Sequence, residues 1–271
     1  MNLSKVETYS RYLEIVEKYG QKGCVTNDYI QREAEGLVAE GKLYESCQGA
    51  NAFLFVKKDT CYRVYYYLND FDEIADFAGE DFVVEILYRG EAFYPTEVVE
   101  YLKRCGFVVN LVRDQYSGMY KDLDITDFVG NLKIEDAQCI EEVQKACDLF
   151  NSSFDYFSGD YIAESEYQSL LDGKNILVAK DIATNTFLGA LHQTIENRVA
   201  WISHVAVLPE ARGQHVGLGL AEDFIQRNHV DDKSRYMLWV QQQNTAAVNM
   251  YQRLGFKYIG KSTLSMIKTK N

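Results

Sequence analysis

The sequence predicts a mixed α/β fold in which a central, mostly antiparallel sheet is flanked by helices. Short apolar runs rich in β-branched and aromatic residues predict strands, and segments whose apolar residues recur at helical spacing lie between them. Hydrophobic residues make up 47% of the 271 residues, which is enough to build a core, and this length allows one or two domains.

The stretch from Trp201 to Gly219, WISHVAVLPEARGQHVGLG, predicts a strand that leads through a loop into a helix. The strand ends at Pro209, and apolar residues recur at helical spacing from Leu220 onward. The glycines and Arg212 therefore lie where the helix begins. The N–H groups and the positive dipole end of a first helical turn bind phosphate, and glycine allows close approach of the backbone. We predict a phosphate-binding loop; the alternative is that its glycines only shape the turn.

A second strand and helix follow this loop. Residues 238–240, Leu-Trp-Val, have the composition of a buried strand. The segment NTAAVNMYQRLGF, from Asn244 to Phe256, predicts a short helix that stops at Gly255 and leads into another strand.

The residues upstream complete an ordered set of elements after a break near 121–127. One early strand comes first, and helices are predicted around 140–150 and 162–171, with an aromatic and acidic loop at 151–160 between them. Strands are predicted at 176–179, 187–193 and 200–207. After the last predicted helix we expect two closing strands.

This half of the chain resembles the GNAT superfamily of N-acetyltransferases. The resemblance rests on two motifs in the family's order, VAVLPEARGQHVG at 205–217 and NTAAVNMYQRLGF at 244–256. It implies the GNAT fold, with acetyl-CoA as cosubstrate. It also implies that the main chain of 205–207 pairs with the pantetheine arm, that 213–218 cradle the pyrophosphate, and that Asn244 contacts the pantetheine region. The implied cofactor-binding residues are Val205, Ala206, Val207, Arg212, Gly213, Gln214, His215, Val216, Gly217, Leu218, Asn244 and Tyr251.

The loop departs from the family's pattern at one position. Counted from Arg212, the pattern Arg/Gln-x-x-Gly-x-Gly/Ala has His215 at its middle glycine. A second frame, from Gln214 to Gly219, matches every letter but lies two residues later after the strand. We prefer the first frame because it keeps the spacing between strand and loop. It requires His215 to adopt a conformation suited to a helix start.

The amino-terminal half repeats part of this order. Residues 52–57 and 62–68 predict a hairpin, 82–88 a strand, and the segment after Pro95 a helix that ends at Cys105-Gly106-Phe107, much as the later helix ends at Leu254-Gly255-Phe256. Between hairpin and helix it has only the acidic stretch 70–81 and no Arg-Gly-x-x-x-Gly loop. We expect a degenerate GNAT-like domain without a CoA loop at 1–123 and a GNAT acetyltransferase domain at 124–271; a chance likeness is the alternative.

Composition limits the partners. The formal net charge of −12 argues against a nucleic-acid partner, because Lys and Arg supply most of the affinity for a phosphate backbone. The sequence shows no long apolar span and no charged-then-apolar amino-terminal signal, so we expect a cytoplasmic protein without a membrane partner. Six scattered cysteines and four histidines without metal-ligand spacing predict free thiols and no metal. A homodimer stays open.

The resemblance implies an N-acetyltransferase in which a primary amine of a small molecule or peptide attacks the acetyl carbonyl directly. A backbone N–H near Val207 stabilises the oxyanion. Tyr251, near the sulfur, is the predicted catalytic residue: a tyrosine hydroxyl with a pKa of about 10 can act as general acid and protonate the departing thiolate. The alternative, in a chain with 20 tyrosines, is a helix residue whose ring only packs in the core.

The general base is not evident in the sequence. Positions where the family often carries one hold Trp201, Ser203 and Trp239. His204 is expected on the opposite strand face from Ser203 and Val205, in the core or an interface. Three carboxylates lie in segments that line the acceptor side in the family, although a solvated surface position is the default for each: Glu196, Asp155 and Glu164.

Two other functions stay open. The missing base suggests a non-catalytic acyl-CoA-binding sensor or interaction protein. A tandem-GNAT aminoacyl transferase working from charged tRNA is disfavoured by the acidic chain and by the pyrophosphate loop. The aromatic and acidic loop at 151–160 suits a cationic or amphipathic amine as acceptor.

Overall fold

The computed structural model describes residues 3–126, 131–157, 161–196 and 198–270. The chain forms two compact units, the first made of Met1–Val112 with Lys261–Asn271 and the second of Arg113–Gly260. The sequence suggested a single boundary at 123/124. The units have other bounds because two long strands, β7 (Val108–Met119) and β13 (Lys257–Lys268), each contribute residues to both of them.

The second unit contains one mixed sheet in the order β8-β9-β10-β11-β12-β7. Neighbouring strands are antiparallel except β11 and β12, which are parallel. Its elements are β8 (Leu132–Asp136), α4 (Ile140–Ser153), α5 (Tyr167–Asp172), β9 (Ile176–Asp181), β10 (Phe187–Glu196), β11 (Val199–Val207), α6 (Val216–Arg227), β12 (Arg235–Gln241) and α7 (Thr245–Arg253). The predicted fold class is confirmed.

Two predicted boundaries in this unit differ from the structure. Helix α4 runs on to Ser153, so the predicted loop at 151–160 begins later, and residues 158–160 of that loop lie outside the described residues. Helix α5 begins only at Tyr167, after a 3₁₀ turn at Glu164–Glu166.

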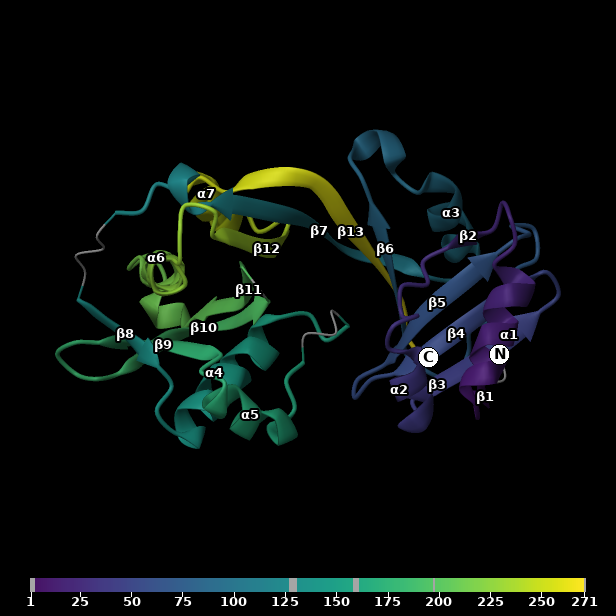
Figure 1. Ribbon diagram of the computed structural model, residues 1–271, viewed down its shortest axis with the longest axis horizontal. Coiled ribbons are helices and arrows are strands. Elements are labelled where there is room, and N and C mark those ends of the chain that lie inside the picture. Colours follow the sequence, from purple (N-terminus) through teal and green to yellow (C-terminus); the bar gives the residue numbers. More distant parts are fainter. Residues whose placement is uncertain (1–2, 127–130, 158–160, 197, 271) are drawn as a thin grey trace. The chain divides into compact units, whose positions relative to one another are not determined.

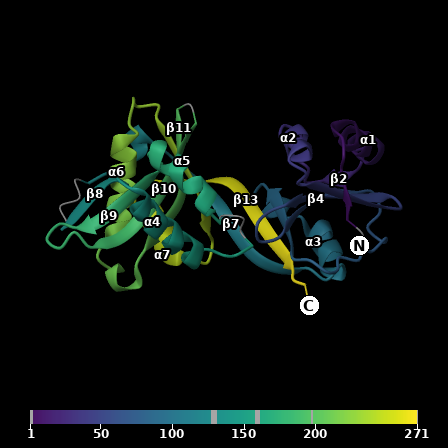
Figure 2. The ribbon, with the colours of Figure 1, turned by 90° about the horizontal axis from the view of Figure 1, so that it is seen from below.

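Helices cover both faces of this sheet (Figures 1 and 2). On one face, Leu191 and Ile202 of the sheet pack with Phe224 of α6 and with α7. On the other face, Ala190 and Ala206 pack with Phe150 of α4 and with α5. The sheet therefore separates two apolar cores, and successive side chains of β10 and β11 contribute to different cores.

The first unit has the same kind of sheet, in the order β1-β3-β4-β5-β6-β13, with β2 paired to β5. The predicted hairpin is confirmed as β4 and β5, and the strand β6 runs parallel to β5. The stretch 70–81, all of it described, contains no helix. The elements are β1 (Ser4–Lys5), α1 (Tyr9–Tyr19), β2 (Val25–Thr26), α2 (Ala34–Ala39), β3 (Leu43–Gln48), β4 (Asn51–Lys57), β5 (Tyr62–Leu68), β6 (Phe82–Tyr88) and α3 (Thr96–Arg104).

Each unit receives its last strand from the other half of the chain. Residues 262–268 of β13 pair antiparallel with β6, and residues 113–119 of β7 pair antiparallel with β12. The prediction of two closing strands after α7 is wrong, because β13 is the single strand there and β7 fills the place beside β12. Leu264 and Met266 are fully buried in the core of the first unit.

We expect Leu264→Ala to destabilise the first unit although Leu264 is close to the carboxyl terminus. Truncation of a fully buried leucine lowers the free energy of unfolding by about 2–5 kcal/mol. Urea denaturation should show the loss as a lower midpoint, whereas Lys270→Ala, at an exposed position, should leave the midpoint unchanged. An unchanged midpoint for Leu264→Ala would contradict the exchanged position of β13.

Candidate functional site

The two parallel strands of the second unit pair over a short stretch and then separate. The pairing of β11 with β12 ends at Ile202 and Leu238, yet β11 continues to Val207 and β12 to Gln241. Along this last part β11 keeps only β10 as a neighbour among the described strands. The sheet therefore has an opening between the ends of β11 and β12.

The backbone of β11 directs polar groups into this opening. The N–H of Leu208 donates to the carbonyl of Leu188, which precedes the part of β10 paired with β11. Counting back from Leu208, every second residue of β11 therefore forms its main-chain hydrogen bonds with β10. By this alternation Ala206 pairs with β10, while the N–H and C=O groups of Val205 and Val207 point away from it. Two residues of β11 thus offer extended main-chain donors and acceptors to a ligand.

Helix α6 begins directly beyond β11, after a 3₁₀ turn at Pro209–Ala211. Gly213 and His215 in the connecting turn have positive φ angles of 78° and 60°. His215 is the N-cap residue of α6, and no side chain caps the helix. The N–H groups of the first turn, at 216–218, therefore have no capping side chain, and the exposed Arg212 adds a positive charge nearby.

The conformation of His215 supports the frame counted from Arg212. Its φ of 60° and ψ of 16° are left-handed, the region that glycine favours, and the family pattern has a glycine at this position. Gly217 and Gly219 of the second frame lie inside α6, without positive φ angles. The sequence required only a conformation suited to a helix start; the structure shows a left-handed one instead of the extended one typical of N-caps.

The start of α6, the end of β11 and helix α7 meet at Gly217. A Cβ atom on Gly217 would lie 3.6 Å from Sδ of Met250, 3.7 Å from Cγ2 of Val207 and 3.9 Å from Cγ1 of Val205. A methyl group at this position would therefore meet these three side chains at ordinary van der Waals contact. Three segments that the sequence assigned to the cofactor are brought together here.

Helix α7 carries the other two predicted residues. Asn244 is its exposed N-cap, and its Oδ1 accepts from the N–H of Ala247 at 3.1 Å. Tyr251 is only 5% exposed, and its ring packs edge-on against Phe256. Its hydroxyl makes no hydrogen bond to another described residue. Burial raises the pKa of Tyr251, so the hydroxyl keeps its proton at neutral pH.

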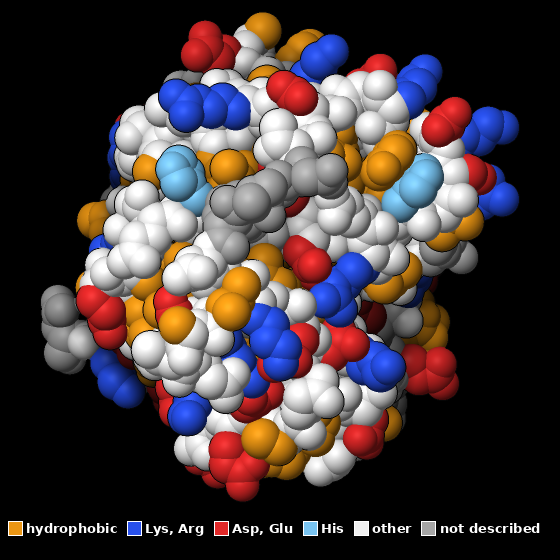
Figure 3. Space-filling model, turned by 90° about the vertical axis from the view of Figure 1, so that its left-hand side faces the viewer, with side chains coloured by type: hydrophobic (Ala, Val, Ile, Leu, Met, Phe, Trp, Pro, Cys, Tyr) orange, Lys and Arg blue, Asp and Glu red, His pale blue; other side chains and the backbone are white. Residues whose placement is uncertain are grey.

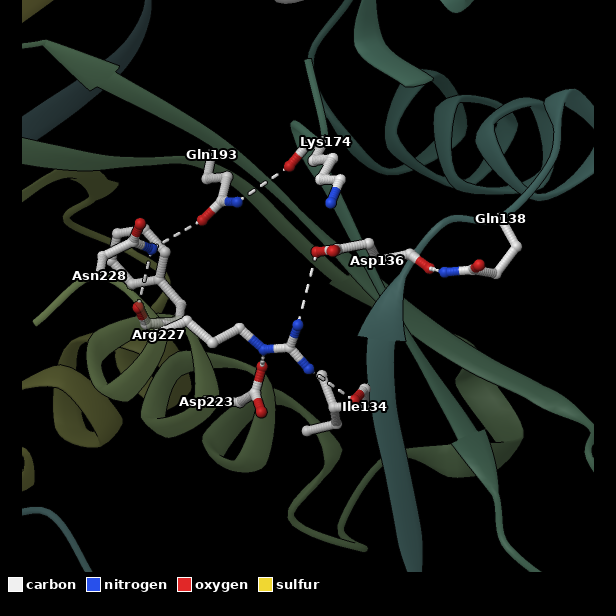
Figure 4. A network of polar contacts seen from close by, with 9 residues as sticks. Ile134, Asp136, Gln138, Lys174, Gln193, Asp223, Arg227 and Asn228 are labelled. Atoms are coloured by element: carbon white, nitrogen blue, oxygen red, sulfur yellow. Dashed lines mark hydrogen bonds and ion pairs between the residues drawn. The ribbon is translucent and has the colours of Figure 1, made fainter. Parts of the chain in front are cut away.

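A polar network anchors the far end of α6 (Figure 4). Arg227 bonds to Asp223 within the helix, donates to the carbonyl of Ile134 and forms an ion pair with Asp136. Asn228 donates to the side chain of Gln193 on β10. These contacts hold α6 against β8 and β10, which fixes the position of its amino-terminal turn.

The first unit closes the corresponding opening with its own chain. Its parallel strands β5 and β6 pair only as far as Val64 and Val84. The side chain of Asn27 donates to the carbonyls of Val64 and Glu85 and accepts from the N–H of Tyr66. Strand β2 also pairs with β5. The backbone groups that a ligand would meet at this place in the first unit are already bonded.

Residues 143–256 match the model of the acetyltransferase (GNAT) family, and this segment contains the opening, the α6 loop and α7. It is a GNAT domain.

Solved structures share the fold of the whole chain at low sequence identity. A tandem GNAT protein from the clavulanic acid biosynthesis pathway, without AcCoA, is 12% identical, and the match covers 98% of both chains with a TM-score of 0.57. A GCN5-related N-acetyltransferase from Sphaerobacter thermophilus is 14% identical over 87% of this chain and 85% of that chain, with a TM-score of 0.59. No curated protein matches the sequence.

A β-bulge in the GNAT domain changes the expected direction of His204. The pairing of β11 with β10 shifts so that Ser203 is the extra residue. Ser203 Oγ lies 3.4 Å from Thr194 Oγ1, and His204 Nδ1 lies 3.1 Å from His192 Nδ1. His192 and Thr194 are two residues apart on β10 and share a face. Ser203 and His204 therefore share that face, so the prediction that they lie on opposite faces is wrong, whereas His204 does lie opposite Val205 and is buried against Phe150, as expected.

The three carboxylates considered as bases lie at or near the surface. Glu196 and Glu164 are exposed, and Asp155 is half-buried with its Oδ1 accepting from the N–H of Phe157. Trp201 and Trp239 are half-buried on β11 and β12 of the GNAT domain. Apart from their positions in the chain, nothing in the sequence marks these residues as a general base.

The surface charge and the hydropathy of the helices bear on the partners that the sequence suggested. Figure 3 shows one face on which acidic and basic side chains are interspersed. On that face the described residues form no contiguous basic tract of the kind that contacts a phosphate backbone. Of the helices in the described residues, none has the length and hydropathy needed to cross a membrane.

We expect substitutions of His215 to report its left-handed backbone. A non-glycine residue in this region costs about 1–2 kcal/mol, and a β-branched residue fits it worst. His215→Gly should leave the free energy of unfolding unchanged or raise it, whereas His215→Val should lower it by about 1–3 kcal/mol. Gln214→Val, at the neighbouring exposed position, serves as the matched control in urea denaturation. Equal effects of the two valine substitutions would argue against the left-handed turn.

Proposed function

We propose that the chain is an acetyl-CoA-dependent N-acetyltransferase that acts on a primary amine of a small molecule or peptide. The observation that carries this proposal is the opening between β11 and β12, whose main-chain groups at Val205 and Val207 lead directly to the uncapped start of α6. An extended ligand with amides at one part and phosphates at another suits this combination. Acetyl-CoA has that composition.

Different residues of the site would bind different parts of acetyl-CoA. The main chain of Val205 and Val207 would hydrogen-bond the amides of the pantetheine arm, as an added strand does at a sheet edge. The N–H groups of 213–218 and the side chain of Arg212 would bind the pyrophosphate. Asn244 keeps its amide hydrogens for the ligand, because only its oxygen caps α7.

The proposed chemistry uses two groups, a main-chain N–H at the opening and the hydroxyl of Tyr251 in the core on the α6 side of the sheet. Of the N–H groups that point into the opening, that of Val205 lies farther from the start of α6 and would stabilise the negative charge that develops on the carbonyl oxygen during attack. Tyr251 holds its proton at neutral pH and would deliver it to the sulfur as the carbon–sulfur bond breaks. Acetyl-CoA supplies the activated acyl group; the chain supplies alignment and protons.

A non-catalytic acyl-CoA sensor is the second candidate. The observation in its favour is that the usual positions for a base hold Trp201, Ser203 and Trp239. A sensor would bind acyl-CoA in the same way but would not transfer the acyl group to an amine.

Tyr251→Phe should separate the two candidates. The hydroxyl makes no hydrogen bond to another described residue, so its removal should leave stability and CoA affinity unchanged. Acetyl transfer to amines should fall by about 10²–10⁴-fold, because a general acid is lost. Calorimetry with CoA and a thiol-release assay over a panel of small amines measure both quantities.

Tyr236→Phe is the matched control for this variant. Its buried hydroxyl donates to the carbonyl of Ile225 at 2.9 Å, so the change should cost stability by about 1 kcal/mol and leave turnover intact. Failure of the native chain to bind CoA would refute the proposal. Binding with no turnover on any amine, by native chain and variant alike, would favour the sensor.

Gly217→Ala should weaken CoA binding without weakening the fold. The nearest atom to the added methyl lies at 3.6 Å, and alanine favours a helix over glycine by about 1 kcal/mol. The methyl would nevertheless enter the space between α6 and β11, and we expect the Kd for CoA to rise about 10-fold. Gly36→Ala, on exposed helix α2 with open space around it, is the control and should stabilise without changing the Kd. Unchanged affinity in both variants would move the ligand away from this helix start.

A further inference from the structure

We propose that His192 accepts the proton of the incoming amine and that His204 is the positioning residue that fixes the imidazole of His192. The inference rests on the proposed N-acetyltransferase function. It assigns the base that the sequence left unassigned, and it places that base on β10, the strand next to β11.

The pair lies at the point where the strands separate. The pairing of β11 with β12 ends at Ile202, and the bulge residue Ser203 and then His204 follow immediately. A ligand with its phosphates at the start of α6 and its arm along 205–207 extends back toward this point. The thioester end would therefore lie beside Ser203 and His204, and His192 lies one strand farther from the opening, next to His204.

The two imidazoles are arranged as a hydrogen-bonded pair. Their Nδ1 atoms are 3.1 Å apart, and the rings lie 8° from parallel with centroids 5.3 Å apart. Such a contact needs an N–H on one ring and a lone pair on the other, so the two histidines have different tautomers when both are neutral. If His192 carries the Nδ1 hydrogen, its Nε2 has a lone pair that can accept a proton.

Burial distinguishes the two partners. His204 is 8% exposed, and its ring stacks on Phe150 at 5.3 Å and meets Phe154 edge-on at 4.9 Å. His192 is only half-buried. The ring that is held on several sides is suited to orient its neighbour, and the more accessible ring is suited to meet a substrate.

The groups against His192 keep it neutral. His192 lies between the uncharged Ile176 on β9 and His204 on β11. The ring of His204 in turn contacts the apolar rings of Phe150 and Phe154. Burial, together with the neighbouring imidazole, lowers the pKa of His192 to about 4. The ring is therefore unprotonated across the neutral range and keeps a lone pair, but it holds a proton much less strongly than an amine does, so a proton that it accepts must pass on to solvent at once.

The proton balance of the step is complete. An ammonium substrate gives one proton to Nε2 of His192, which passes it to solvent. The amine nitrogen then bonds to the acetyl carbonyl carbon, and the carbon–sulfur bond breaks while Tyr251 protonates the sulfur. A second proton from the nitrogen restores Tyr251. One proton is released for each amide formed.

The tautomers can be measured without any substrate. Nitrogen-15 NMR of the imidazoles in the full chain should show His192 protonated at Nδ1 and unprotonated at Nε2 from pH 6 to pH 8. In His204→Phe this preference should be lost. A hydrogen at Nε2 of His192 in the native chain would overturn the proposal, whether or not an acceptor amine has been found.

Kinetics test the role itself, with acetyl-CoA and the amine of the panel that the native chain acetylates fastest. His192→Gln should lower kcat about 100-fold or more at pH 7, with the Kd for CoA unchanged. The deficit should shrink at pH 9, where more of the amine is already unprotonated. His204→Phe should lower kcat, and His204→Gln, whose amide oxygen can accept from Nδ1–H, should restore part of it.

The controls separate this inference from the proposed function. His229→Gln alters an exposed histidine and should keep the native rate, and thermal melting of each variant excludes a folding defect. Native turnover by a folded His192→Gln variant would overturn the inference alone. Absence of CoA binding by the native chain would instead overturn the proposed function.

Discussion

The separation of β11 from β12 is the constraint on which the rest of the site depends. Backbone N–H and C=O groups that leave one sheet partner need another, because an unpaired buried polar group costs free energy. In the first unit the side chain of Asn27 supplies the partner at the end of β5 and β6. In the second unit no described strand or side chain closes the opening, and a helix start lies beside it. The same strand order thus gives backbone groups bonded by Asn27 in the first unit and an unpaired stretch of strand edge in the described residues of the second.

The helix beside the opening is held at one end and strained at the other. Arg227 and Asn228 tie the carboxyl end of α6 to β8 and β10. The turn before its first residue contains His215 in the left-handed region, and such strain persists where the surrounding structure fixes it. The anchored end therefore allows the turn to keep a backbone that histidine disfavours. Nothing in the structure explains why histidine rather than glycine occupies this position.

Periodicity and motif order were enough to predict the local elements and the place of the loop, because each depends on residues close in sequence. The exchange of β7 and β13 depends on which strands pair over long distances, and no local pattern in either strand encodes it. The direction of His204 depends on one extra residue, Ser203, in β11. Strict alternation places His204 correctly opposite Val205 but wrongly opposite Ser203, since a single bulge changes the relation between the side chains before and after it. The left-handed backbone of His215 was visible only as a departure from the glycine pattern.

The bulge also decides how the proposed acid and base are distributed. Tyr251 belongs to the core on the α6 face of the sheet, whereas His204 packs on Phe150 of the core on the α4 face. The sheet separates these cores except at the opening between β11 and β12. A reacting carbonyl held in that opening can meet a proton donor from one face and a proton acceptor from the other. Because the sheet lies between the two proposed groups, a proton that Tyr251 would give to sulfur would not pass directly to His192. In this proposal the end of the β11–β12 pairing is both the binding edge and the place where the two sides of the sheet would act on the same atom.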